Sequence, residues 1–201
     1  MTSLAAHPQK NSIRLQLKKN RVLGDMTPGQ FAELEPLLVL ADYRKGDPLV
    51  RQGDEEMEQF FILEGMLKRV VSNPQGREMI LRFAAEGEMD HSYAAWRLRT
   101  PVPYSITAVT KVRIAEIAMP LWVDFLERHP DVKARFEYEV MKLMSEVMAH
   151  TITLHLLDAR GRLLRFERKH PELAGRIPKK ELAAYLNLTP ETLSRLKQKL
   201  G

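Results

Sequence analysis

Residues 176–201 read R-I-P-K-K-E-L-A-A-Y-L-N-L-T-P-E-T-L-S-R-L-K-Q-K-L-G, two short helical patterns joined by a tight turn. We expect the first helix to begin near Pro178, because the fixed φ of proline suits a first helical turn. Leu182 and Leu186 then recur four residues apart and share one face. Asn187 can adopt the left-handed conformation that ends a helix. The small alanines between the two leucines would let a second helix cross closely.

The second helix has a clear predicted start and two different faces. Thr189 is expected to be its N-cap and Pro190 its first residue. The spacing of three and seven residues turns one apolar row inward, namely Leu193, Leu196 and Leu200. The outward row is polar and has cationic flanks, and it consists of Glu191, Ser194, Arg195 and Gln198 beside Lys197 and Lys199. Such a face suits the major groove of DNA. The simpler alternative is a surface helical hairpin with a basic face.

This segment resembles the helix-turn-helix of the catabolite-activator/fumarate-nitrate-regulator (Crp/Fnr) family, whose recognition helix follows roughly S/T-x-E-T-x-S/G-R. The resemblance implies that Arg195 bonds guanine O6 and N7 and that Glu191 accepts from cytosine N4. It also implies that phosphates are contacted by Thr189, Thr192, Lys179 and Lys197. The candidate DNA-binding residues are therefore Lys179, Thr189, Glu191, Thr192, Ser194, Arg195, Lys197 and Lys199.

Two departures from the family pattern change what is expected of the DNA site. Pro190 stands where many members carry a base-reading arginine, so the preferred site should differ from that of the best-known members. The sequence ends at Gly201, directly after the recognition helix, whereas most relatives continue into a β-hairpin wing. We therefore expect a wingless helix-turn-helix without wing-to-phosphate contacts, and a lower intrinsic affinity for DNA.

Charge is distributed unevenly along the 201 residues. Residues 160–201 contain 11 Lys or Arg and 4 Asp or Glu, a net charge of +7, and residues 1–21 carry a net charge of +5. The span between them, residues 22–159, has a net charge of −7. An acidic body joined to a basic C-terminal module is typical of a sensor attached to a nucleic-acid reader.

Composition excludes several classes of protein. There is no apolar run of 18 residues, so no transmembrane helix is expected. The N-terminus lacks the apolar core of a secretory signal, which predicts a cytoplasmic protein without a membrane partner. The absence of cysteine excludes disulfides, thiolate-bound zinc and an all-cysteine iron–sulfur cluster. No cofactor or metal is expected, because the six histidines lack metal-ligand spacing.

Residues 22–120 read as short strands separated by turns. Glycine or acidic turns recur at Gly46, Gly53, Gly65, Gly76 and Gly87, with short apolar or alternating runs between them. This punctuation predicts a β-sandwich, barrel or roll. A short helix is expected before it. The fold class is therefore α+β: a jelly-roll-like β-roll, a long helix and an all-α C-terminal module.

The same region resembles the cyclic-nucleotide-binding β-roll of the family. The stretch Y-R-K-G-D-P-L-V-R-Q-G-D-E-E-M-E-Q-F-F-I-L-E-G-M-L-K, residues 43–68, matches it at seven positions, which are Gly46, Gly53, Asp54, Phe61, Ile62, Leu63 and Gly65. The stretch from Ser105 to Ile117 matches a late strand pair. The resemblance therefore covers about residues 25–201.

The nucleotide-binding residues of that roll are missing here. The family pattern has a Gly-Glu pair for the ribose and, about ten residues later, an Arg followed by Ser or Thr for the cyclic phosphate. A gapless alignment puts His91 and Ser92 at the first pair of positions and Val102 and Pro103 at the second. Valine cannot pair with a phosphate, and proline has neither a hydroxyl nor an N–H. We therefore do not expect cyclic AMP to be the effector.

What occupies the pocket instead is open at this stage. The candidate effector-pocket residues are His91, Ser92, Tyr93, Trp96, Val102 and Tyr104. The aromatic members could line a cavity for another ligand, but packing that closes the roll is the favoured interpretation. The sequence Asp90-His91-Ser92 is not a hydrolase triad, because adjacent residues do not converge. An enzyme is therefore not expected.

A long helix is predicted from Pro130 to about Asp158. An apolar row with spacings of four and three residues runs along it and supplies the candidate dimer interface, which is Phe136, Val140, Leu143, Val147, His150 and Leu154, continuing to Leu157. A second row, Met141, Met144 and Met148, lies beside the first. One row would pair with a second copy and the other would pack on the roll. A single buried helix is the alternative. The resemblance implies a parallel homodimer as well.

The predicted organisation is a basic extension at 1–21, a roll at 22–129, a dimerisation helix at 130–158 and a helix-turn-helix module at 159–201. The extension could be an added strand, suggested by the alternation of Ile13, Leu15 and Leu17, or a DNA-contacting arm, or a tail, with disorder favoured for residues 1–10. The predicted function is a homodimeric regulator of transcription that binds palindromic DNA and contacts RNA polymerase. The alternative is a small-molecule sensor whose helix-turn-helix serves protein contacts.

Overall fold

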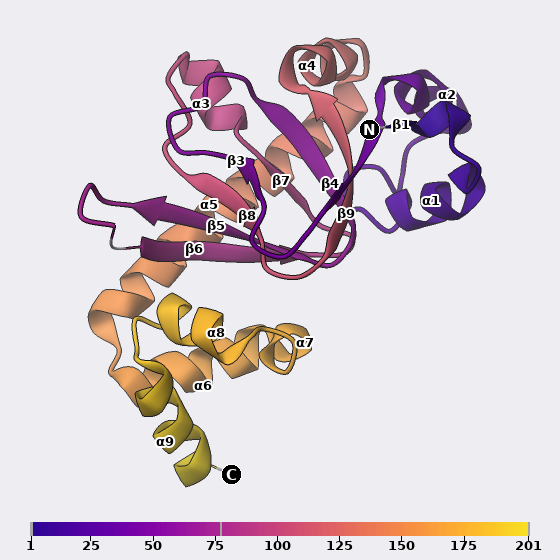
Figure 1. The fold of residues 1–201 in the computed structure, drawn as a ribbon. Coiled ribbons are helices and arrows are strands. Elements are labelled where there is room, and N and C mark those ends of the chain that lie inside the picture. The colour runs from indigo at the N-terminus through magenta and orange to yellow at the C-terminus, as the bar shows by residue number, and fades with distance from the viewer. Residues whose placement is uncertain (1, 77, 201) are drawn as a thin grey trace.

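The structure is a computed structural model that describes residues 2–76 and 78–200. The side chain of Leu200, which the sequence places in the inward row, lies outside the described part. Figure 1 shows a β-roll, a long helix α5 that crosses it, and a group of short helices at the far end of α5. No helix within the described ranges is long and apolar enough to cross a membrane.

Within the described residues, nine strands form two antiparallel sheets. The strands are β1 (Thr2–Ser3), β2 (Val39–Tyr43), β3 (Pro48–Val50), β4 (Glu58–Glu64), β5 (Met66–Ser72), β6 (Glu78–Ala85), β7 (Met89–His91), β8 (Ser105–Ala108) and β9 (Val112–Ala118). One sheet has the order β1-β2-β9-β4-β7 and the other β3-β8-β5-β6. The predicted α+β class with a jelly-roll-like roll is confirmed.

The helices are α1 (Lys10–Leu17), α2 (Pro28–Leu34), α3 (Tyr93–Leu98), α4 (Met119–Arg128), α5 (Pro130–Leu156), α6 (Ala159–Lys169), α7 (Pro171–Ala174), α8 (Lys179–Tyr185) and α9 (Pro190–Leu200). Two 3-10 turns, Leu4–Ala6 and Glu35–Leu37, complete the described elements. The helix predicted before the roll is α2, which begins with a capping box between Thr27 and Gln30. The long predicted helix is α5, with Pro130 as its first residue.

Glycines in left-handed backbone make the predicted turns of the roll. Five of the turn glycines have φ between +77° and +97°. Gly65, between β4 and β5, shows why glycine is required, because a Cβ there would lie 2.1 Å from the carbonyl oxygen of Lys111. A side chain at this position would push two neighbouring loops apart. The glycines that predicted turns in the sequence therefore stand where the backbone needs a left-handed conformation.

Two apolar clusters hold the molecule together. The larger fills the space between the two sheets and extends to α1, α4 and the first half of α5. Trp122, Phe125 and Phe136 form its aromatic centre, with Trp122 and Phe136 ring centroids 5.4 Å apart. The smaller cluster joins the outer side of β5 and β6 to the C-terminal helices. The roll and the C-terminal module therefore share a core.

The N-terminal segment is ordered and packs on the roll, so the favoured prediction of disorder is wrong for residues 2–10. Thr2 and Ser3 pair with β2, which bears out the added-strand alternative for these two residues only. The alternation that suggested a strand further on lies in helix α1, where Ile13 and Leu17 are buried and Leu15 is 66% exposed. The four-residue spacing of Ile13 and Leu17, which suits one face of a helix, therefore decided the structure here, and the two-residue alternation did not.

Candidate DNA-binding surface and effector region

The C-terminal helices form the predicted helix-turn-helix. Helix α8 begins one residue after Pro178, which serves as its N-cap. The turn contains Asn187 at φ +52°, the left-handed conformation that the sequence indicated. The backbone N–H of Leu188 donates to the carbonyl oxygen of Ala183 at 2.8 Å and closes the turn. Helix α9 begins at Pro190, and Thr189 caps it by accepting from the N–H of Thr192 at 3.2 Å.

The inward row packs as predicted where it is described. Leu182 and Ala183 on α8 and Leu186, the C-cap of α8, are buried, and Leu193 on α9 is buried against them. Leu196 is partly buried against the same cluster. Because Ala183 has only a methyl group, α9 can cross α8 closely at this point. This packing fixes the outward face of α9.

Six of the eight candidate DNA-binding residues lie on α9, and the other two, Lys179 and Thr189, lie at the start of α8 and in the turn. Those with exposed side chains are Lys179, Thr189, Glu191, Arg195, Lys197 and Lys199, whereas Thr192 and Ser194 are half-buried. Helix α9 projects away from the roll, so the face is open to a large partner (Figure 1). The structure therefore brings most of the predicted residues together on α9, with Thr189 in the turn before it and Lys179 at the start of α8.

Glu191 is held in its charged form at the start of α9. Hydrogen bonds from its own backbone N–H and from the Thr189 side chain lower its pKa. The positive charges of Lys179 and Arg195 lower the pKa further. A carboxylate in this state accepts hydrogen bonds only, and such an acceptor suits the amino group of cytosine. Lys179, Glu191 and Arg195 thus form one electrostatic group across the two helices.

Helix α8 also docks on the β-roll, which the sequence did not indicate. Lys68 on β5 pairs with Glu181 on α8 at 2.8 Å, with both side chains largely buried. Arg176 donates twice to Glu86 in the β6–β7 turn, at 2.8 Å each. The Tyr185 ring lies 5.3 Å from the Phe83 ring. The orientation of α9 relative to the roll is therefore set by direct contacts and not by the α5 connection alone.

The candidate effector pocket is closed by its own side chains. His91, Ser92, Val102 and Tyr104 are at most 9% exposed, and the Tyr104 hydroxyl donates to the carbonyl oxygen of His91 at 2.8 Å. Tyr93 and Trp96, on α3, are half-buried. The Tyr93 ring packs edge-on against Phe136 of α5 at 5.0 Å. This arrangement agrees with the interpretation that the aromatic residues pack the roll shut.

Sequence reasoning missed the charged pair at the centre of this region. Arg69 on β5 and Asp90 on β7 are both buried and form an ion pair. The Arg69 guanidinium also donates to the carbonyl oxygen of His91 at 2.9 Å and lies 4.1 Å from the centroid of the Tyr104 ring. The strand register shifts between Arg69 and Val70, and both side chains are buried there. Such a bulge leaves no mark in the sequence pattern.

Burial and charge decide the protonation states around the pair. Burial alone would raise the pKa of Asp90, but the charges of Arg69 and Arg82 lower it below its usual range. Burial lowers the pKa of His91 to about 3, and the nearby arginines contribute in the same direction. Asp90 is therefore ionised and His91 neutral near pH 7. The Arg69–Asp90 ion pair and the Tyr104 hydroxyl thus both lie beside the His91 carbonyl oxygen, which accepts a hydrogen bond from Arg69 and another from Tyr104.

The predicted dimer interface on α5 needs correction. Phe136 and Leu143 are 0% and 4% exposed, because they pack on the roll of their own chain. The His150 ring stacks on the Tyr185 ring at 3.8 Å, also within the chain. Val140, Val147 and Leu154 are half-buried on this side. The row proposed for the partner is therefore the row that faces the roll and the C-terminal module.

The second row of α5 is exposed instead. Its large apolar side chains are Tyr138 at 62%, Met141 at 64%, Met144 at 48%, Met148 at 65%, Ile152 at 49% and Leu156 at 76% exposure. We call these six residues the methionine face. Six large apolar side chains along one helix are more exposed apolar surface than scattered surface residues account for.

Comparisons with known proteins agree with this architecture. The model of the cyclic nucleotide-binding domain family matches residues 40–129. The chain is similar to the nitrogen fixation regulation protein FixK of Bradyrhizobium diazoefficiens, with 23% identity over 195 residues that cover 92% of this chain and 81% of FixK. It is also similar to the cAMP-activated global transcriptional regulator CRP of Salmonella typhimurium, with 21% identity over 164 residues that cover 77% and 78% of the two chains.

A solved structure shows the same fold. FixK2 from Bradyrhizobium japonicum superposes with a TM-score of 0.71 at 16% identity, over 81% of this chain and 84% of that one. The matched share includes most of the chain, so the likeness extends beyond the roll. The order of roll, long helix and C-terminal helices is thus a known arrangement.

Proposed function

Because the chain belongs to the Crp/Fnr family of transcriptional regulators, we propose that it is a sequence-specific regulator that binds double-stranded DNA as a homodimer. The observation that carries the proposal is the exposed row of α9. It presents Glu191 and Arg195 on a capped, well-packed helix of a module with a net charge of +7. A regulatory role, and not a catalytic one, is part of the proposal.

Each residue of the row has a proposed part in reading DNA. Arg195 donates to guanine O6 and N7, and Glu191 accepts from cytosine N4. Thr189, Thr192 and Lys179, together with Lys197, contact phosphates and set the register of the helix in the groove. The half-buried Ser194 and the exposed Lys199 complete the contact surface. Since Arg195 and Glu191 lie four residues apart on one face, they can reach neighbouring base pairs.

We propose that the methionine face of α5 forms the homodimer. Pairing two copies along this face would bury apolar side chains that are otherwise 48–76% exposed. A two-fold axis along α5 would present two α9 helices to DNA. Two half-sites one helical turn apart, about 34 Å, would then form a palindrome. RNA polymerase is a further proposed partner, and the cytoplasm is the proposed location.

We propose that cyclic AMP is not the effector. Support comes from the interior of the roll, where Arg69 pairs with Asp90 and lies over the Tyr104 ring, and the Tyr104 hydroxyl donates to the carbonyl oxygen of His91. Val102 and Pro103 stand where the family has its phosphate-binding pair, and Val102 is buried. A nucleotide could enter only by displacing a buried ion pair and its hydrogen bonds, which is costly.

The test is selection of bound duplexes from a random library, followed by fluorescence anisotropy on the enriched sequence. We expect a palindromic site that is bound far more tightly than a scrambled duplex at the same salt concentration. Cyclic AMP should leave this affinity unchanged. A library with no enriched sequence would contradict the DNA-reading function. A gain in affinity with cyclic AMP would contradict the proposed independence from it.

A further inference from the structure

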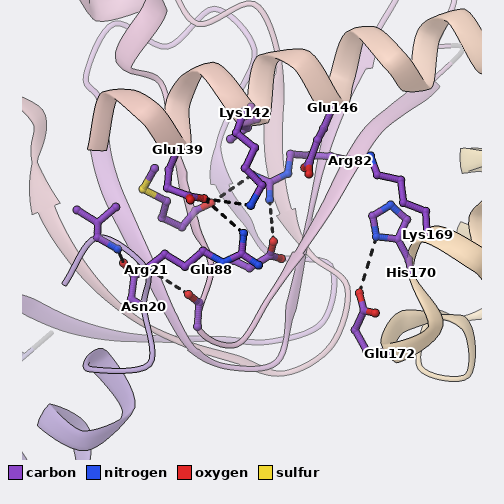
Figure 2. Close-up of a pocket in the computed structure, with 14 residues that line it drawn as sticks. Asn20, Arg21, Arg82, Glu88, Glu139, Lys142, Glu146, Lys169, His170 and Glu172 are labelled. Atoms are coloured by element: carbon purple, nitrogen blue, oxygen red, sulfur yellow. Dashed lines mark hydrogen bonds and ion pairs between the residues drawn. The ribbon is translucent and has the colours of Figure 1, made fainter. Parts of the chain in front are cut away.

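A polar cavity lies where four parts of the chain meet. Its volume is about 310 Å³, and its walls come from the N-terminal segment at residues 20–22, the strand β6 with the β6–β7 turn, the middle of α5, and the end of α6 with α7. Figure 2 shows the charged side chains of these elements converging on one space. It is separate from the closed interior of the roll, because His91, Val102 and Tyr104 are not among its lining residues.

The cavity wall has balanced charge. Four Lys or Arg side chains and four Glu side chains line it, with His170 beside them. Burial lowers the pKa of His170, so this residue adds little positive charge near pH 7. A purely anionic ligand would meet four carboxylates, and a purely cationic ligand would meet four cations. The balance favours a ligand that carries both signs of charge.

The charged groups of the wall are only loosely satisfied by one another. Lys142 lies 3.6 Å from Glu139, and Arg82 lies 3.5 Å from Glu88, measured between nitrogen and oxygen. Both distances exceed that of a good N–H···O hydrogen bond, which is about 2.7–3.2 Å. Glu88 also accepts from the backbone N–H of Ala85 at 2.8 Å, and Arg82 donates to the carbonyl oxygen of Met89 at 3.2 Å. Lys142 and Glu139 therefore retain more capacity to bond a guest than Glu88 does.

Lys169 and Glu146 are the two unpaired charges of the cavity wall within the described residues. Each lines the cavity, and neither forms a salt bridge with any residue in the described ranges. Figure 2 shows Lys169 reaching from α6 toward the side of the cavity that Glu146 borders from α5. An ammonium and a carboxylate that face the same space without pairing are complementary to a carboxylate and an ammonium on a small molecule.

We propose that this cavity binds a small zwitterionic metabolite of the amino-acid class. Its carboxylate bonds Lys169, with Arg82 nearby, and its ammonium bonds Glu146. The volume is at the lower end of the range for small-molecule sites, roughly 300–1,000 Å³, and suits an amino acid better than a nucleotide. The ligand would join α6 of the DNA-binding module to α5. Its role as an effector rests on the proposed DNA-binding function, whereas binding itself does not.

The first experiment measures binding without DNA. The full-length protein is titrated calorimetrically with each of the twenty common L-amino acids singly. We expect saturable binding of at least one, weakened at least tenfold by Glu146→Gln and by Lys169→Gln. Matched controls are Glu137→Gln on α5 and Arg168→Gln on α6, which do not line the cavity and should bind as the wild type does. Failure of all twenty to bind would overturn the proposal.

Ligand analogues separate the two charge contacts. The analogue of the bound amino acid that lacks its amino group should bind the wild type weakly, and Glu146→Gln should weaken it no further. The analogue that lacks its carboxylate should also bind the wild type weakly, and Lys169→Gln should weaken its binding no further. Equal losses for both variants with both analogues would mean a general loss of folding and would overturn the assigned contacts.

The second experiment measures DNA affinity on the selected duplex with and without the bound amino acid. We expect a shift of at least threefold in the wild type and none in Glu146→Gln. Saturable binding with no shift would overturn the effector role while leaving the binding site in place. A protein that selects no DNA sequence but still binds the amino acid would contradict the proposed function and not this site.

Discussion

Arg195 is one exposed guanidinium, and its proposed role is specific enough to be tested alone. Arg195→Ala should cost about 1–3 kcal/mol of binding free energy on the selected duplex and relax the preference at one base pair in each half-site. Anisotropy with single-base variants of the duplex measures both effects. Lys197→Ala is the matched control, because loss of a phosphate contact should weaken binding to all sequences alike. Equal losses on selected and scrambled DNA would argue against base reading by Arg195.

Asp90 tests the charged pair inside the roll. Asp90→Asn leaves the buried charge of Arg69 without its partner, so we expect a loss of about 3–5 kcal/mol in the free energy of unfolding. Urea denaturation at pH 7.5 measures it. The control is Asp42→Asn, since Asp42 is 55% exposed and its pair with Arg113 should contribute about 1 kcal/mol or less. A change below about 1 kcal/mol in Asp90→Asn would mean that water or another group compensates Arg69.

At the scale of elements, α5 shows how a helix can be predicted correctly and oriented wrongly. The apolar spacing and Pro130 predicted its start and approximate length. Both rows of the helix are apolar, however. Apolar periodicity distinguishes these two rows from the polar faces but does not say which of the two packs on the roll. The row with Phe136 and Leu143 met the roll because the aromatic cluster around Trp122 lies on that side. The methionine face remained exposed.

The methionine face leads to a prediction about assembly. Met148→Glu places a charge in the middle of the proposed interface and should convert the homodimer to a monomer, as light scattering after gel filtration would measure. Stability of the monomer's roll should change little, because Met148 is 65% exposed. Leu121→Glu, on α4 with 48% exposure, is the control and should leave the dimer intact. A Met148→Glu protein that is still dimeric would place the interface elsewhere.

At the scale of the whole molecule, Tyr185 ties the DNA-binding module to the roll. Its ring contacts Phe83 of β6, His150 of α5 and Phe166 of α6, with the His150 ring 3.8 Å away. Tyr185→Ala should cost about 3–5 kcal/mol and release α8 from the roll. Hydrogen exchange should then speed up in residues 159–200 and stay unchanged in β2 to β9. Leu164→Ala, exposed on α6, should alter neither region. Uniformly faster exchange would instead indicate one cooperative unit.

Stability should also depend on buried neutral histidines, and the pKa values of His91 and His150 are lowered the most. Burial lowers the pKa of His91 to about 3 and that of His150 to about 4, from an ordinary value near 6.5. Between pH 6.5 and 4 the unfolded chain therefore binds protons that the folded chain does not. The contribution of these two histidines to stability should therefore fall with decreasing pH across this window, by at most about 1.4 kcal/mol per pH unit for each histidine. The glutamates whose pKa values are raised act in the opposite direction, namely Glu58, Glu88 and Glu116. Because the pKa of Asp90 is lowered, the stability that its charged form contributes is lost only at lower pH.

Urea denaturation at pH 7.5, 6.0 and 5.0 measures this dependence. His150→Gln should flatten part of the slope, and the exposed His155→Gln should leave it as in the wild type. A slope of the same steepness in His150→Gln would show that the stacked imidazole does not titrate differently in the folded and unfolded protein.

Local chemistry in the sequence determined much of this molecule. Gly65 and the other turn glycines, the Thr189 cap, Pro190 and the left-handed Asn187 each act within a few residues of themselves. Their effects could therefore be read without knowing what lies nearby. The strand-rich roll, the long helix and the outward row of α9 followed from such signals.

Tertiary structure alone decided which surfaces meet. The bulge that buries Arg69 beside Asp90, the side of α5 that faces the roll, and the docking of α8 on β6 all join residues far apart in the chain. The polar cavity also draws its walls from four separate segments. A pattern in sequence specifies that a face is apolar or charged. Only the packing of the whole chain specifies what covers that face, because the choice depends on the shapes and charges of every competing surface.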